Sequence, residues 1–185
     1  MVPDSARADL AIPSDHTVFL ISASNLADPV KAVGDALEGF QSAFSDSDSA
    51  TLLVVGRGKL TTSQKNIRHL GYLDAAAMQT VLGASDYQIV TSLAENQPLA
   101  ISEAQASGVS LIARNSTGLP EHTNYDADSQ LFNSPDELVE VLRSTAEKPR
   151  SRQAREELSS MALSRYEPHA IAQRYVDVYE SLLAN

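Results

Sequence analysis

The most informative segment of this sequence carries two glutamates separated by seven residues, and their carboxylates could bind hydroxyl groups. Glu95 and Glu103 lie on either side of Pro98, which is expected to open a helix that Gly108 closes. This arrangement leaves Glu95 in a loop and places Glu103 within the helix. A carboxylate on the helix could accept two hydrogen bonds from a ribose diol, and the loop carboxylate could do the same for a sugar.

The backbone at this predicted helix start adds a second kind of binding group. The amides from Asn96 to Leu99 precede the helical hydrogen bonds, so they are free to bind an anion or a hydroxyl. Paired glutamates often arise by chance in an acidic chain, but this pair brackets a strand-to-helix turn, where α/β proteins bind ligands. The sequence therefore predicts a ligand site around residues 95–103.

A lysine in an earlier loop has an unusual position for a cation. Asp28 and Pro29 predict a helix cap followed by proline at the first helical position, which puts Lys31 in the first turn. The helix dipole disfavours a cation there by about 0.3 kcal/mol or somewhat more. An anion such as a phosphate at this spot would explain the lysine. The alternative is a surface lysine paired with Asp28 or Asp35.

The loop Val55-Gly56-Arg57-Gly58-Lys59 follows another apolar run. Glycine on either side of Arg57 suits a tight strand exit and a close approach of backbone, and a plain turn is the favoured interpretation. The sequence contains neither GxxxxGK[ST] nor GxGxxG, which excludes a P-loop and the dinucleotide-binding fingerprint.

Short apolar runs alternate with helix-period segments along the chain. The runs are nearly continuous in apolar residues, as in parallel strands that are covered on both faces. Asp74 is expected to cap one helix, and Ser134-Pro135-Asp136-Glu137 resembles a capping box that opens another. This alternation predicts an α/β domain with a mainly parallel, doubly wound sheet and C-terminal helices. The predicted strands are 17–22, 51–55, 87–90 and 110–113, with a weaker one at 67–70, and the last two predicted helices are 151–164 and 168–183.

Composition narrows the class of protein further. The chain has 185 residues, a net charge of −10, and neither cysteine nor tryptophan. These features exclude disulfide, thiol and iron–sulfur chemistry, and they disfavour binding to nucleic acid. The four histidines are scattered, so no metal site is expected, and no apolar run approaches membrane-spanning length. We expect a cytoplasmic protein.

The segment SLAENQPLAISEAQASGVSLIARNSTGLPE resembles the donor-site signature of group 1, retaining glycosyltransferases with the GT-B fold. In that family two glutamates flank seven residues and are followed by a small-residue helix, a glycine, a strand and a Gly-x-Pro-Glu turn. Glu95, Glu103, Gly108 and 118–121 match this pattern. Similar matches extend over nearly the whole chain, in the segments ARADLAIPSDHTVFLIS, SNLADPVKAVGDALEGF, HLGYLDAAAMQTVLGASDYQIVTS and RYEPHAIAQRYVDVYESLL.

The resemblance implies a role for each matching residue. Lys31 matches the lysine that binds phosphate, Glu103 the glutamate that holds the ribose hydroxyls, and Glu95 the glutamate that contacts the transferred sugar. Lys31 and Glu95 are thus the expected catalytic residues. Backbone groups of the remaining residues are expected to contact the base, the sugar and the diphosphate. The full predicted donor-binding set is Ser24, Asn25, Lys31, Gly56, Tyr72, Leu73, Asn96, Gln97, Pro98, Leu99 and Glu103.

Four positions depart from the family pattern. Ser24 and Asn25 stand where the family usually has Gly-Arg, so one cation for the diphosphate is missing. Ala32 replaces the usual glycine after the lysine, and Ser110 replaces a common proline. The loss of the arginine matters most, because a hydrogen bond to a charged group is worth about 1.5–3 kcal/mol.

The resemblance also implies a Rossmann-like, three-layer domain that forms one half of a GT-B enzyme. We expect residues 1–14 to be a leader from the interdomain linker and 15–185 to be the nucleotide-sugar-binding domain. The acceptor half would be a missing N-terminal domain, through which any membrane association would occur. Retaining transfer on this fold needs no metal or other cofactor, and the isolated domain should bind donor but barely transfer it.

Two alternatives remain open at this point. One is a half-domain of a sugar-nucleotide epimerase, which turnover without an acceptor would favour. The other is a non-catalytic α/β interaction module, for which Asn25 in place of arginine is the best argument.

Overall fold

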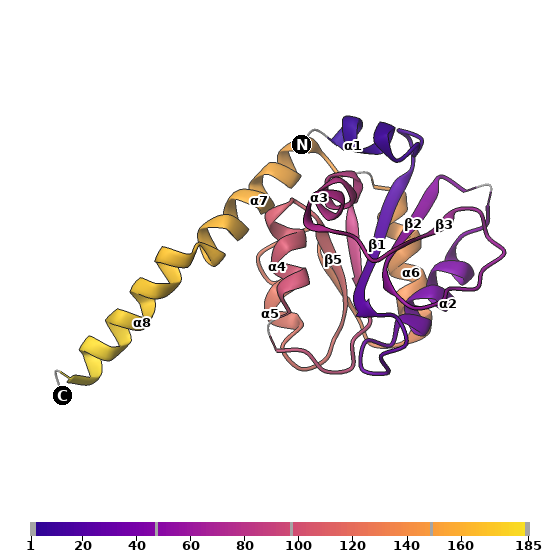
Figure 1. The fold of residues 1–185 in the computed structure, drawn as a ribbon. Coiled ribbons are helices and arrows are strands. Elements are labelled where there is room, and N and C mark those ends of the chain that lie inside the picture. The colour runs from indigo at the N-terminus through magenta and orange to yellow at the C-terminus, as the bar shows by residue number, and fades with distance from the viewer. Residues whose placement is uncertain (1–2, 47, 97, 149, 184–185) are drawn as a thin grey trace.

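The computed structural model describes residues 3–46, 48–96, 98–148 and 150–183, and its centre is one parallel sheet. The sheet has six strands in the order β3-β2-β1-β4-β5-β6 (Figure 1). The order reverses between β1 and β4, which is the topological switch point of a doubly wound fold. The strands are β1 (Thr17–Asn25), β2 (Ala50–Arg57), β3 (Ile67–Gly71), β4 (Tyr87–Val90), β5 (Ser110–Arg114) and β6 (Gln130–Phe132).

Helices cover both faces of the sheet, which gives the predicted three-layer, Rossmann-like domain. α2 packs with α6 on one face, while α1 packs with α3 and α4 with α7 on the other (Figure 1). The fold prediction is therefore confirmed. The helices are α1 (Pro3–Asp9), α2 (Val33–Ala43), α3 (Ala75–Ala84), α4 (Leu99–Ala106), α5 (Pro120–Thr123), α6 (Pro135–Ala146), α7 (Arg152–Tyr166) and α8 (Pro168–Leu183).

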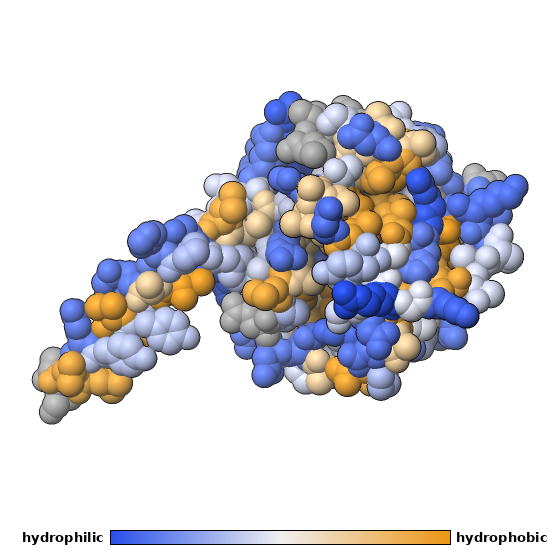
Figure 2. All heavy atoms as spheres, in the orientation of Figure 1, coloured by the Kyte–Doolittle hydropathy of each residue, from blue (hydrophilic) through white to orange (hydrophobic). Residues whose placement is uncertain are grey.

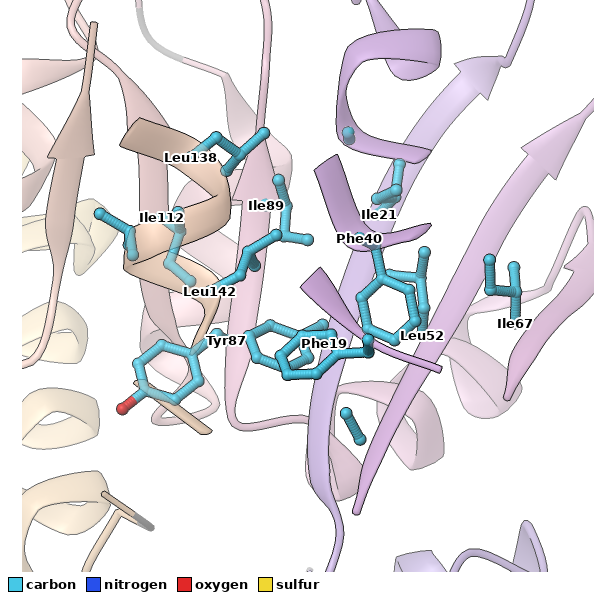
Figure 3. Packing of buried hydrophobic residues seen from close by; sticks show 14 of the residues in the cluster. Phe19, Ile21, Phe40, Leu52, Ile67, Tyr87, Ile89, Ile112, Leu138 and Leu142 are labelled. Carbon is cyan, nitrogen blue, oxygen red and sulfur yellow. The ribbon is translucent and has the colours of Figure 1, made fainter. Parts of the chain in front are cut away.

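Aromatic rings fill the core between the sheet and the α2–α6 layer. Phe19 lies at the centre, with its ring centroid 5.8 Å from that of Phe40 and 5.9 Å from that of Tyr87. Figure 3 shows these rings beside Leu52 and Ile89. Truncating a buried phenylalanine costs about 3–5 kcal/mol, so this cluster holds β1 and β4 firmly side by side. The carboxyl ends of those two strands are thereby fixed relative to each other.

The start of α2 differs from the prediction. The helix begins at Val33, four residues after Pro29, because Ala32 has φ +46° and interrupts the helical backbone. The Asp28 carboxylate accepts a hydrogen bond from the amide of Val30 at 2.9 Å, which is a local turn and no helix cap. Val30 is 43% exposed and does not belong to the apolar face. Lys31 consequently lies just before the helix, and its predicted place in the first turn is wrong.

Two other predicted helix caps are confirmed. Asp74 caps α3 by accepting a hydrogen bond from the amide of Ala77 at 2.9 Å. Ser134 accepts from the amide of Glu137 at 3.2 Å and so caps α6. The carboxylate of Glu137 accepts from the amide of Asn133, one residue before the position that a full capping box uses.

Both ends of the described chain are helical. The predicted leader contains α1, which the sequence did not predict, and its Ala6 and the following Ile12 are buried in the core cluster on the α3 side. α7 and α8 match the last two predicted helices. α8 has no buried residue, and Figure 2 shows apolar side chains exposed along it. Over the described residues, no helix has the length and apolar character needed to cross a membrane.

Candidate functional site

The loops that follow β1 and β4 are joined at the switch point of the sheet. The amide of Leu93 donates a hydrogen bond to the carbonyl of Val30 at 2.8 Å. The Thr91 hydroxyl lies 3.0 Å from the carbonyl oxygen of Lys31 and 2.9 Å from that of Ala32. Ligands of doubly wound folds bind at this crevice. The lysine loop and the glutamate loop thus form one structure at the expected place.

Lys31 and Glu95 form an ion pair across this junction. The ammonium of Lys31 donates to Oε1 of Glu95, and their side chains are 31% and 12% exposed. Neither Asp28 nor Asp35 is the partner that the alternative interpretation required. Asp35 instead accepts from the Arg114 guanidinium at 2.5 Å. The structure therefore brings the two predicted catalytic residues into contact, with a cation and a carboxylate at one point.

Beside this pair lies a cavity of about 230 Å³. Five members of the predicted donor-binding set line it, from four different parts of the fold. A smaller cavity of about 30 Å³, lined by Lys31, Glu95 and Pro98 among others, shares Ser22, Ala23 and Ala100 with it. The two cavities are therefore neighbours. The predicted residues that line the larger cavity are Ser24, Gly56, Tyr72, Leu73 and Glu103.

Helix α4 places Glu103 on this cavity. Pro98 is the cap residue, with φ −72° and ψ 124°, and the helix begins at the exposed Leu99. Gly108 follows its end with φ +76°, and a Cβ there would meet the carbonyl oxygen of Arg155 at 2.6 Å. The predicted helix is confirmed, and it separates the loop glutamate from the helix glutamate. Gln97 lies outside the described residues, so its predicted contact stays a prediction.

The turn before α5 forms hydrogen bonds with the backbone of Glu95. The amide of Glu95 donates to the Thr117 hydroxyl at 2.9 Å, and that hydroxyl is 2.8 Å from the carbonyl oxygen of the same glutamate. The amide of Gly118 donates to this carbonyl as well, at 2.9 Å. A Cβ on Gly118 would lie 2.7 Å from the carbonyl oxygen of Asn96. The glycine of the Gly-Leu-Pro-Glu turn is thus required by a close approach of backbone.

Asn25 and Tyr72 of the predicted set make contacts that the sequence did not show. Asn25 accepts a hydrogen bond from the amide of Ala27 at 3.0 Å, so its side chain turns back onto its own loop. Arg57 pairs with Asn25 in the register of β1 and β2, and its guanidinium lies 4.2 Å from the ring centroid of Tyr72. The expectation of a plain turn at residues 56–59 gave this cation no place beside the predicted site. The glycines on both sides of Arg57 were the only signal for it.

The described residues contain no group of three or more histidine, aspartate or glutamate side chains arranged to hold a metal ion. At the switch point the described residues bring together the Lys31 ammonium and the Glu95 carboxylate, and the Glu103 carboxylate lines the neighbouring cavity.

A family model described as glycosyl transferases group 1 matches residues 17–148, which is most of the chain. The chain belongs to the group 1 glycosyltransferases. The matched range contains every residue of the glycosyltransferase site described above. No curated protein matches this glycosyltransferase chain.

Solved structures share the fold over almost all of this glycosyltransferase chain. Sucrose-phosphate synthase from Thermosynechococcus elongatus is 20% identical with a TM-score of 0.76, over 98% of this chain and 49% of its own. HepE of Anabaena, solved with UDP and glucose, is 17% identical with a TM-score of 0.75, over 97% and 52%. WaaG, a glycosyltransferase involved in lipopolysaccharide biosynthesis, is 16% identical with a TM-score of 0.72, over 95% and 50%. The chain spans about half the length of these solved chains and matches one half of the GT-B fold.

Proposed function

We propose that this chain is the donor-binding domain of a retaining glycosyltransferase, which binds a nucleoside-diphosphate sugar for transfer to an acceptor. The observation that carries the proposal is the contact between Lys31 and Glu95 at the switch point, directly beside the cavity that Glu103 lines. HepE, a structural relative, has been solved with UDP-glucose, which is a ligand of this class.

Each part of such a donor has a matching group in the crevice. Glu103 would accept hydrogen bonds from the two ribose hydroxyls, and the backbone of Tyr72 and Leu73 would hold the base. The ammonium of Lys31 and the amides between Asn96 and Leu99 would face the diphosphate. Glu95 would orient the sugar, with its carboxylate positioned by the lysine even before a donor arrives. A charge-assisted hydrogen bond of this kind is worth about 1.5–3 kcal/mol.

The same groups would act on the transition state of transfer. Negative charge develops on the diphosphate as the glycosidic bond breaks, and preorganised donors stabilise such charge most effectively. Lys31 and the start of α4 would supply this stabilisation without a metal ion. The acceptor and the groups that bind it would come from a second, N-terminal domain, since the relatives are about twice as long. Glycan or glycolipid biosynthesis in the cytoplasm, with any membrane contact made by that second domain, completes the proposal.

Titration of the domain with UDP, GDP and ADP tests the proposal. We expect saturable binding of one nucleotide, weakened about tenfold or more by Lys31→Ala, which equals about 1.4 kcal/mol or more. Lys65→Ala is the matched control, because it removes one exposed lysine charge away from the crevice. Calorimetry or chemical-shift mapping gives the affinities. Absence of binding by all three nucleotides at millimolar concentration would contradict the proposal and favour a non-catalytic interaction module.

A further inference from the structure

A buried histidine connects the loop that carries Glu95 to the C-terminal end of α7. His122 lies in α5 and is only 5% exposed. Its Nε2 atom is 3.4 Å from the carbonyl oxygen of Asn96, and its Nδ1 atom is 3.2 Å from the hydroxyl of Tyr166. A carbonyl oxygen can only accept a hydrogen bond, so Nε2 is the donor to the loop. The imidazole therefore bridges the glutamate loop and the last residue of α7.

The bridge belongs to a closed polar network. The hydroxyl of Tyr166 is 2.8 Å from that of Tyr125, which donates to Oε1 of Gln105 at 2.5 Å. Gln105 is fully buried and returns a hydrogen bond from its Nε2 to the carbonyl of His122 at 2.6 Å. Buried polar networks of this kind are rigid when every member is satisfied, and they shift together when one member is removed. Helices α4, α5 and α7 are thus tied to one another through side chains.

Two sets of contacts reach the loop that carries Glu95, one from the turn before α5 and one from His122 of the network. Thr117 and Gly118 hold the amide and the carbonyl of Glu95, while His122 holds the carbonyl of Asn96. Polar groups of three consecutive peptide bonds are therefore contacted from the β5–α5 side. The carboxylate of Glu95 projects from this held backbone to Lys31. Its position depends on the turn, and the turn depends on His122.

We propose that His122 is a positioning residue that sets the Glu95–Asn96 turn for the sugar of the donor, and that Tyr166 makes this turn respond to how the end of α7 is held. The proposal rests on the proposed function for the sugar, although the physical link exists without a ligand. α8 begins at Pro168, two residues after Tyr166, and has no buried residue of its own. A change in the direction of α8 would move the Tyr166 hydroxyl and, through His122, the loop that carries Glu95.

The link is tested first on the protein without nucleotide. Tyr166→Phe removes one hydroxyl and keeps the ring, and we expect the amide resonances of Glu95, Asn96 and Gly118 to shift. Tyr179→Phe is the matched control, because its hydroxyl lies on the exposed face of α8 and the residue is 60% exposed. Unchanged amide resonances at Glu95 and Asn96 in Tyr166→Phe would overturn the link, whether or not the domain binds nucleotide.

Two conservative variants then separate the ends of the bridge. The amide of His122→Gln can replace Nε2 as donor to the loop, and that of His122→Asn can replace Nδ1 toward Tyr166. We expect His122→Asn to lower the affinity for UDP-glucose at least threefold more than the affinity for UDP, and His122→Gln to preserve the wild-type ratio. Equal changes for the two ligands in both variants would overturn the positioning role. If the wild-type domain binds GDP or ADP in place of UDP, the sugar nucleotide of that base replaces UDP-glucose in this comparison. If it binds none of the three nucleotides, the proposed function fails, and the amide shifts still decide the link.

Discussion

Ala32 has a backbone conformation that its own side chain disfavours. Its φ of +46° lies in the left-handed region, where a non-glycine residue costs about 1–2 kcal/mol, and group 1 glycosyltransferases usually have glycine at this position. The Thr91 hydroxyl lies within hydrogen-bond distance of the carbonyl oxygens of Lys31 and Ala32, which flank the Ala32 Cα, so the loop keeps this shape despite the cost. The lysine loop is thus imposed by contacts from the loop between β4 and α4, and its own sequence would favour an earlier helix.

Replacing this alanine with glycine relieves the strain. We expect Ala32→Gly to leave the free energy of unfolding unchanged or to raise it by up to about 1 kcal/mol, because the relief outweighs the added freedom of the unfolded chain. Urea unfolding measures the difference. Ala76→Gly, on an exposed helical position of α3, should destabilise by up to about 1 kcal/mol. Equal losses for the two variants would show that the backbone at Ala32 is unstrained.

Arg57 supplies a cation close to the position where the family's arginine is missing. Its guanidinium stacks on Tyr72 at the mouth of the larger cavity, so a base held there would lie next to it. We expect Arg57→Ala to weaken nucleotide binding by about 0.5–2 kcal/mol, which is about two- to thirtyfold. Lys59→Ala, in the same loop, should change it little. Equal weakening by both variants, measured by calorimetry, would point to overall charge and away from a stacked contact.

At the scale of elements, the sequence predicts the strands and helices that neighbouring residues determine, and it misses the features that distant contacts determine. The long apolar runs and the caps at Asp74 and Ser134 act within a few residues, and the corresponding strands and helices were predicted. The start of α2 was missed because Thr91, 59 residues beyond Ala32, decides it. β6 was missed because three residues carry too little periodicity to stand out.

The candidate site divides in the same way. The resemblance named eleven donor-binding residues, and five of them line one cavity. Sequence reasoning left the partner of Lys31 open, because Glu95 is 64 residues away along the chain. It also missed the contacts of His122, since a single histidine in an acidic chain has no periodic or motif signal. Pairings across the sheet are fixed by topology, which short-range patterns do not encode.

The turn before α5 makes a prediction at this scale. Gly118→Ala would press its Cβ against the carbonyl oxygens of Glu95 and Asn96, at 3.0 and 2.7 Å, so the loop must move. We expect a loss of about 1–3 kcal/mol in unfolding free energy, as for overpacking, together with shifted amide resonances at Glu95 and Asn96. Gly34→Ala in α2 meets no atom within 4 Å, so it should leave those resonances in place and stabilise by up to about 1 kcal/mol. A stable Gly118→Ala domain with an unmoved loop would contradict the account of this turn.

Across the whole molecule, one carboxylate holds three separate parts of the chain together. Asp86 precedes β4 and accepts from Arg7 of α1 at 2.6 Å and from the amide of Val18 of β1 at 2.8 Å. Its other oxygen accepts from Arg155 of α7 at 3.2 Å. Burial lowers the pKa of the Arg155 guanidinium, and Asp86 opposes that effect. The first and the seventh helix are therefore joined to the sheet through one nearly buried carboxylate, in addition to hydrogen bonds from both arginines to the carbonyl groups of residues 83–85.

Removing this charge tests the anchor. Asp86→Asn leaves two largely buried guanidinium groups without their counter-charge, and breaking a buried ion pair in this way costs about 3–5 kcal/mol. We expect that loss in urea unfolding, with faster hydrogen exchange in α1 and α7 than in α6. Glu156→Gln removes a carboxylate from an exposed pair with Arg152, and its cost should stay below about 1 kcal/mol. A similarly small loss for Asp86→Asn would mean that apolar packing and the other hydrogen bonds of Arg7 and Arg155, to the carbonyl groups of residues 83–85, hold these helices without the charge.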